Sequence, residues 1–307
     1  WGGAETYAPR ELQRVVDGAA LLLDQRRAQG AVVLEDGHPR AFGMTTFVDE
    51  ALIEAYLDDP HPHLGKRLLL EAHNPDTTSV LQPHQIAERN AALGLQVVVV
   101  NCAMDPATRD PGTVLGAVIA ASFHVHRGYR IARYINEVFG EMSVSIIEAS
   151  RSYEIRRRFE LPIDGAMMCS LVGTLTREQA VAWSNPLLAM FAYSPPRLRF
   201  THAEQRVLCE ALAGVTDETL SARLSIPVSA VKARWTRIQE RVARLAPTLY
   251  IDIPETPRHG RGVQTRHLIL QYVRDHPSEL TPYAWPATRV RQRRVMTRAQ
   301  TTDPDHS

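Results

Sequence analysis

The sequence predicts an α+β amino-terminal domain followed by an all-α helix-turn-helix domain. Three observations lead to this fold class. Residues 11–193 mix apolar strand-like runs with segments of helical spacing, which is typical of an α+β domain. Ser194-Pro195-Pro196 then interrupts the chain, because consecutive prolines cannot continue a helix and stiffen a short linker. Residues 200–246 divide into three short helical segments with two tight breaks, as a helix-turn-helix does.

Composition limits the class of protein. The chain has 307 residues, enough for two domains, and 44% hydrophobic residues, which is ordinary for a globular protein. The net charge is +1, but basic residues outnumber acidic ones between Arg197 and Pro247, as a phosphate-binding module requires. Cys102, Cys169 and Cys209 are too scattered for a disulfide framework or a zinc site, so a cytoplasmic location is expected. No apolar run has membrane-spanning length, so no membrane partner is expected.

The first elements follow from the spacing of apolar residues. A helix is expected over residues 11–27, and a hairpin of strands over 31–36 and 41–48, because Asp36-Gly37 favours a tight turn. Further helices are expected over 49–57, 62–72 and 82–93, the last with Pro83 in its opening turn.

Residues 95–104 predict a strand that is apolar on both faces and therefore central in its sheet. Residues 113–125 are expected to form its antiparallel neighbour across the loop 105–112. These two segments would line or floor any pocket. The remaining expectations are a helix over 129–140, strands over 143–149 and 153–161, an apolar segment over 167–174 and a helix over 177–193.

The segment from Phe200 to Ala246 has clear helix boundaries. Thr201 and Glu204 have the spacing of a capping box, Thr216 offers a second cap, and Pro227 suits the first turn of a third helix. The inward stripe of this third helix consists of Val231, Trp235, Ile238, Val242 and Leu245, and Pro247 ends the helix.

These residues resemble the DNA-binding domain of LuxR/NarL-type regulators. The positions that match the pattern of that family are Glu204, Val207, Leu208, Ala213, Gly214, Thr216, Leu220, Ala222, Leu224, Ile226, Val231 and Lys232. Pro227, Ala230 and Arg234 depart from it. The third helix also resembles region 4 of sigma factors. The resemblance implies a one-component transcriptional regulator, not an enzyme, that binds double-stranded DNA as a homodimer. A small-molecule effector and RNA polymerase are further candidate partners.

The outward face of the third helix gives the expected DNA contacts. Small residues early on this face let the backbone approach the major groove, and Arg237 would reach a guanine edge or a phosphate. The candidate DNA-binding residues are Ser229, Ala230, Lys232, Ala233, Arg234, Thr236, Arg237 and Arg241. A helical hairpin with a solvated basic face is the alternative.

Two other patterns offer chemistry. His124 and His126 would share one face of a strand, but no acidic residue completes a metal site, so no metal and no cofactor are expected. The sequence His126-Arg127-Gly128-Tyr129-Arg130-Ile131 resembles the acyl-CoA pyrophosphate loop of GNAT acetyltransferases, with Arg130 in place of the second glycine of that loop. It implies an alternative, a GNAT-like acyl-CoA-binding enzyme fused to a helix-turn-helix. A sigma-like, polymerase-associated protein is a third possibility. No catalytic residue is assigned.

The expected organisation therefore has five parts. They are an α+β sensory or assembly domain over 1–193, a linker over 194–199, the helix-turn-helix over 200–247, a helical extension over 248–284 and a flexible Arg-rich tail over 285–307.

Overall fold

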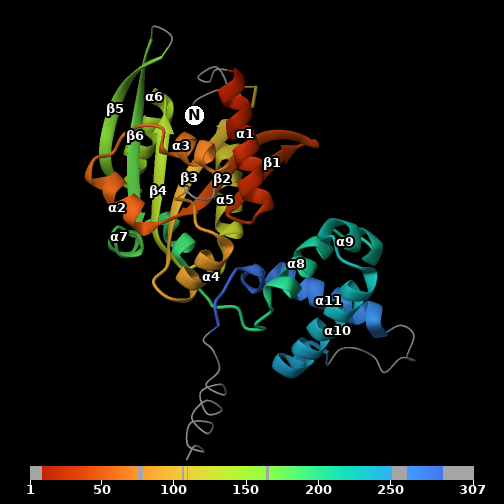
Figure 1. Cartoon of the computed structure of the whole chain (residues 1–307). Helices are drawn as coiled ribbons and strands as arrows, with labels where there is room; N and C mark the ends of the chain where they lie inside the picture. Colours follow the sequence, from red (N-terminus) through yellow and green to blue (C-terminus); the bar gives the residue numbers. More distant parts are fainter. Residues whose placement is uncertain are drawn as a thin grey trace, which may run out of the picture.

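The computed structural model describes residues 9–74, 79–105, 107–108, 110–163, 166–250 and 261–285. The expected Arg-rich tail lies, from residue 286 on, outside the described residues. The described chain folds into a mixed six-stranded sheet with helices on both faces, followed by a helical unit (Figure 1).

The strands are β1 (Ala28–Glu35), β2 (His38–Val48), β3 (Leu95–Met104), β4 (Ile131–Phe139), β5 (Glu154–Ile163) and β6 (Ala166–Thr176). Their order in the sheet is β1-β2-β3-β4-β6-β5. All neighbouring strands are antiparallel except β3 and β4, which are parallel. The predicted hairpin is confirmed, since Asp36 and Gly37 join β1 to β2 with left-handed φ angles of 52° and 78°.

One face of the sheet is covered by α1 (Pro9–Asp24), α2 (Glu50–Asp58) and α3 (Leu64–Glu71), whose apolar side chains pack on Met44, Val98 and Ile135. The other face carries α4 (Pro83–Ala91), α5 (Pro111–Val125), α6 (Glu141–Ser150) and η2 (Pro186–Phe191). The short helix α7 (Arg177–Ala182) follows β6 directly. The sheet is thus buried on both faces near its centre.

Three predicted elements of the amino-terminal part were wrong. Residues 113–125 form helix α5, which Asp110 caps by accepting a hydrogen bond from the Thr113 amide. Residues 131–139 form strand β4 where a helix was expected, and α6 replaces the strand expected over 143–149. Strand β4 buries Tyr134 on one face and Ile135 on the other, so its apolar residues imitate helical spacing.

The predicted fold class was also wrong. Helix α5 is the crossover that joins the parallel strands β3 and β4, and this connection makes the sheet an α/β fold. The carboxyl-terminal helices are joined to this sheet by hydrogen bonds. Helices α8 (His202–Ala211), α9 (Asp217–Leu224), α10 (Val228–Leu245) and α11 (Arg261–Asp275) share an apolar cluster.

The segment that begins with η4 (Pro277–Leu280) attaches this helical unit to the sheet body. The Arg26 guanidinium donates to the Leu280 carbonyl at 2.9 Å, the Asn90 amide to the Pro282 carbonyl at 2.9 Å, and the Ala284 amide to the Ala87 carbonyl at 3.0 Å. These contacts join segments far apart in sequence, which local spacing cannot reveal.

Candidate functional site

Strands β3 and β4 separate partway along their length. They pair only from Leu95 with Ile131 to Val98 with Ile135. Beyond that point β3 stays paired with β2, and β4 with β6. A bulge at Val100 in β3, opposite Met44 and Thr45, accompanies the separation. The facing edges of the two strands therefore border an opening in the middle of the sheet.

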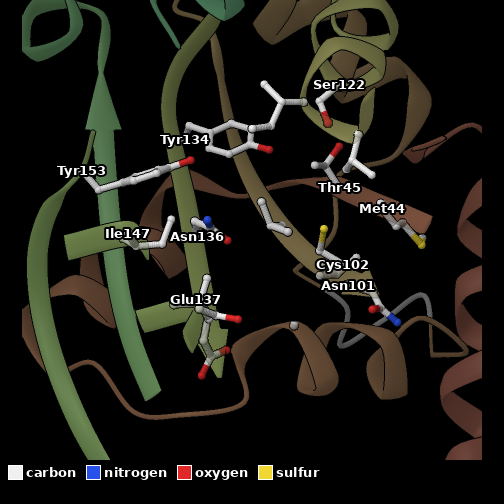
Figure 2. A pocket seen from close by; sticks show the side chains of 18 of the residues that line it. Met44, Thr45, Asn101, Cys102, Ser122, Tyr134, Asn136, Glu137, Ile147 and Tyr153 are labelled. Carbon is white, nitrogen blue, oxygen red and sulfur yellow. The ribbon is translucent and has the colours of Figure 1, made fainter. Parts of the chain in front are cut away.

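A cavity of about 450 Å³ occupies this opening (Figure 2). Its walls come from β2, β3, β4, α5, α6 and η2, and from the start of α3. The apolar side chains that line it include Leu115, Val118, Ile119, Phe123, Ile146, Ile147, Leu187 and Met190. The expectation that residues 95–104 and 113–124 line a pocket is confirmed, although the second segment is a helix.

Glu137 is the carboxylate in this cavity. It projects from β4 beside the start of α3 (Figure 2), and its two oxygens accept hydrogen bonds from the amides of His63 at 2.5 Å and Leu64 at 2.9 Å. His63 precedes α3 and does not cap it with its own side chain, so Glu137 supplies the cap from another element. Burial raises the pKa of Glu137 to about 7, and the backbone hydrogen bonds only partly oppose this shift.

Close packing of α3 against β3 brings the cap to Glu137. A Cβ atom at Gly65 would lie 2.7 Å from the Val100 carbonyl oxygen and 2.9 Å from its Cα. Only glycine allows the first turn of α3 to lie this close to the bulged strand. Gly65 thus fixes the distance between α3 and the cavity.

Hydroxyl and amide groups line another part of the cavity. The Tyr153 hydroxyl is hydrogen-bonded to the Asn136 side chain, and burial raises the pKa of Tyr153. Burial also raises the pKa of Tyr134. Both phenols therefore keep their protons at neutral pH.

Cys102 lies in the same cavity, where burial raises the pKa of its thiol to about 12. A protonated thiol is a poor nucleophile, so the arrangement does not favour Cys102 as an acyl carrier.

His126 is held neutral next to the cavity. Its Nδ1 is 2.7 Å from the Ser122 carbonyl oxygen, and its Nε2 is 2.9 Å from the Thr45 hydroxyl. Burial lowers the pKa of His126 to about 4, so Nδ1–H donates to Ser122 and Nε2 accepts from Thr45. This pair of bonds fastens the end of α5 to β2. His124 and His126 therefore lie at a helix end and not on a shared strand face.

Among the described residues, no group of three or more His, Cys, Asp or Glu side chains is arranged to hold a metal ion. In the same part of the chain, no helix is both long and apolar enough to cross a membrane.

The predicted pyrophosphate loop, residues 126–131, does not open a helix. It links the end of α5 to β4, and a Cβ atom at Gly128 would lie 2.5 Å from Ser278. Because η4 fills the space beside this glycine, the loop is a packing contact with the carboxyl-terminal segment. This arrangement does not fit the pyrophosphate loop that residues 126–131 resemble.

The predicted DNA-contacting residues all belong to α10. Those with exposed side chains are Ser229, Lys232, Ala233, Thr236 and Arg237, whereas Ala230, Arg234 and Arg241 are half-buried. Arg241 forms an ion pair with the buried carboxylate of Glu204 at 3.1 Å, so it stabilises the helical unit. No contact in the structure tests a role in DNA binding for this set.

The sequence did not single out Glu137, Asn136, Tyr153 or Thr45. One signal was available for Glu137, a lone carboxylate that stands with Asn136 between the apolar residues Ile135 and Val138. A carboxylate at such a position is either exposed to solvent or buried with hydrogen-bond partners that offset the cost of its burial.

No family model matches the chain. No curated protein matches it either. Among solved structures, Arabidopsis thaliana NAA60 in complex with a bisubstrate analogue is 15% identical, with a TM-score of 0.33, over 55% of this chain and 83% of that chain. FeeM, an N-acyl amino acid synthase from uncultured soil microbes, is 10% identical, with a TM-score of 0.29, over 55% of this chain and 92% of that chain.

NAA60 is described with a bisubstrate analogue and FeeM as a synthase, and neither description is that of a DNA-binding regulator. This finding contradicts the predicted function, a LuxR-type transcriptional regulator that is not an enzyme. It likewise contradicts the predicted partners, which were double-stranded DNA, an effector, a homodimer mate and RNA polymerase.

Proposed function

We propose that the sheet body is an acyltransferase of GNAT-like fold that transfers an acyl group from a thioester to an amine. The observation that carries this proposal is the apolar cavity where the parallel strands β3 and β4 separate, with the carboxylate of Glu137 inside it. It does not depend on the low structural similarity described above.

The edge of β3 past Val98 suits the acyl donor. Its backbone groups on the β4 side are not paired with β4, so an amide-bearing thioester arm can add to this edge as an extra strand would. The acyl chain would then lie against α5 and α6. Each buried CH₂ contributes about 0.8 kcal/mol, so these apolar walls favour a chain longer than acetyl.

Glu137 is the proposed general base. A pKa of about 7 matches the requirement for a group that must take up and release a proton at neutral pH. The amine nitrogen attacks the thioester carbonyl, the C–N bond forms and the C–S bond breaks. The proton of the amine passes to Glu137 and then to the leaving thiolate, so the carboxylate is regenerated.

Thiol release from a series of acyl-CoA donors, with a panel of amine acceptors and the full chain, tests the proposal. We expect tighter donor binding with longer acyl chains, and a loss of turnover of at least a hundredfold in Glu137→Gln, since general-base catalysis contributes about 10²–10⁴-fold. Glu141→Gln, which changes an exposed carboxylate on α6, is the matched control. Absence of saturable acyl-CoA binding by the wild-type chain would refute the proposal.

Two further expectations from the sequence remain proposals. The LuxR/NarL-like resemblance of residues 200–246 is retained as a proposal about the arrangement of helices α8, α9 and α10 alone. A cytoplasmic location is proposed because the three cysteines are free.

A further inference from the structure

A second cavity lies where the helical unit meets the sheet body. This junction cavity, of about 440 Å³, is lined by Leu21, Asp24, Gln25, Arg26, Arg27, Ala72, His73, Gln82, Pro83, His202 and Arg206. The lining comes from the end of α1 and the start of β1, from the end of α3 and the start of α4, and from α8. It shares no residue with the cavity between β3 and β4.

Cationic side chains dominate this lining. Arg26, Arg27 and Arg206 contribute three guanidinium groups, and Asp24 contributes the single carboxylate among the lining residues. Within the described part of the chain, none of the three arginines takes part in an ion pair with Asp or Glu. Asp24 is therefore the one carboxylate, among the lining residues, that can offset their positive charge.

The arginines are positioned by different means. Arg27 is buried, and its guanidinium donates to the carbonyls of Leu81 at 3.2 Å and Val80 at 2.6 Å. Arg26 has a left-handed φ of 57°, a conformation that residues with side chains rarely adopt, and its Nη2 is held by the Leu280 carbonyl. Arg206 is exposed. The first two are fixed by the fold, while the third is free to close on a ligand.

The surroundings of the cavity also carry positive charge. Burial lowers the pKa of His202, and the charges of Arg26 and Arg206 lower it further. Helix α4 begins at the cavity, at Pro83, and has no acidic residue in its first turn, so the partial positive charge of its start adds to the field of the guanidinium groups.

We propose that the junction cavity binds the phosphate or diphosphate group of a small phosphorylated molecule. Guanidinium groups pair with phosphate oxygens through two parallel hydrogen bonds. A concave site of this size fits a small molecule, whereas a nucleic-acid duplex requires an extended basic stripe. Such a ligand would touch both the sheet body and the helical unit. The proposal does not rest on the acyltransferase function.

Calorimetric titration of the full chain with inorganic pyrophosphate, at constant ionic strength, is the test. We expect saturable binding that Arg206→Gln weakens at least tenfold, the usual effect of losing a charge-assisted hydrogen bond. Arg206→Lys keeps the charge but loses the second parallel hydrogen bond, so its affinity should lie between those of the wild type and Arg206→Gln. Arg244→Gln removes the same charge from an exposed position on α10 and should bind as the wild type does. Thermal unfolding verifies that each variant is folded.

A repeat titration with a saturating acyl thioester that carries no phosphate, acyl-pantetheine, separates this site from the proposed donor site. Pyrophosphate should still bind, because the two cavities share no residue. Three results would overturn the proposal: no saturable binding to the wild type, wild-type affinity in Arg206→Gln, or loss of pyrophosphate binding in the presence of acyl-pantetheine. A lack of acyl-CoA binding with normal pyrophosphate binding would refute only the acyltransferase proposal.

Discussion

The ionisation of Glu137 gives a quantitative prediction about stability. The pKa of this carboxyl is raised from its ordinary value of 4.5 to about 7, mainly by burial. Since one pKa unit corresponds to about 1.4 kcal/mol, the ionised form costs the folded state roughly 3 kcal/mol relative to the protonated form. The stabilising contribution of the protonated carboxyl is complete below pH 4.5 and is lost as the pH rises to about 7.

The substitution Glu137→Gln removes this titration. Its amide oxygen still accepts one of the two backbone hydrogen bonds, from His63 or Leu64, so the variant is expected to be about 1 kcal/mol less stable than the wild type at pH 4.5. By pH 8 the order reverses, because the wild type then carries the buried charge. Urea unfolding at half-unit pH intervals measures the difference in unfolding free energy between the two proteins.

Comparing wild type with variant cancels the titration of other groups, provided that unfolding is two-state. Glu141→Gln serves as the control, since its exposed side chain should leave the pH dependence unchanged. If the difference between wild type and Glu137→Gln stays constant from pH 4.5 to 8, the raised pKa of Glu137 is wrong. Its assignment as a general base at neutral pH would then lose its physical basis.

Two further predictions concern packing at the same cavity. Gly65→Ala places a Cβ atom 2.7 Å from the Val100 oxygen, so it should lower the free energy of unfolding by about 1–3 kcal/mol and weaken acyl-donor binding. Gly116→Ala on α5 is the control, since its Cβ atom would meet no atom within 4 Å and should leave stability unchanged or raise it. Urea unfolding measures both effects on stability. Thr45→Val leaves His126 Nε2 buried without its hydrogen-bond donor, so we expect the free energy of unfolding to fall by about 1–3 kcal/mol in the same measurement. An unchanged stability would show that this hydrogen bond does not hold α5 in place.

Local signals predicted several elements correctly. The Asp36-Gly37 turn, the central strand 95–104 and the Thr201 capping box all depend on residues within a few positions of one another. Such features form wherever the chain carries them, because turn dihedral angles and side-chain caps are satisfied within the segment itself.

The errors arose in segments that are apolar on two sides, because the spacing of apolar residues then no longer distinguishes a helix from a strand. Helix α5 is apolar around much of its circumference, so its sequence could not be distinguished from a buried strand. Strand β4 carries apolar residues on both faces, which produced a false helical spacing. Because residues 113–125 were expected to form a strand and residues 129–140 a helix, the predicted fold lacked the crossover helix between two parallel strands. The predicted fold class was wrong for this reason.

The sequence by itself determined the hairpin, the central strand and the boundaries of helices α8, α9 and α10, because short-range hydrogen bonds and turn geometry specify them. Only the tertiary structure decided where β3 and β4 separate and which groups line the resulting cavity. Glu137 acquires its raised pKa because the folded chain buries it, and the amides at the start of α3 only partly oppose this shift. Likewise, Arg206 of α8 lines the same cavity as Arg26 and Arg27 only in the folded chain. Burial and charge proximity are properties of the folded chain, so no local pattern contains them.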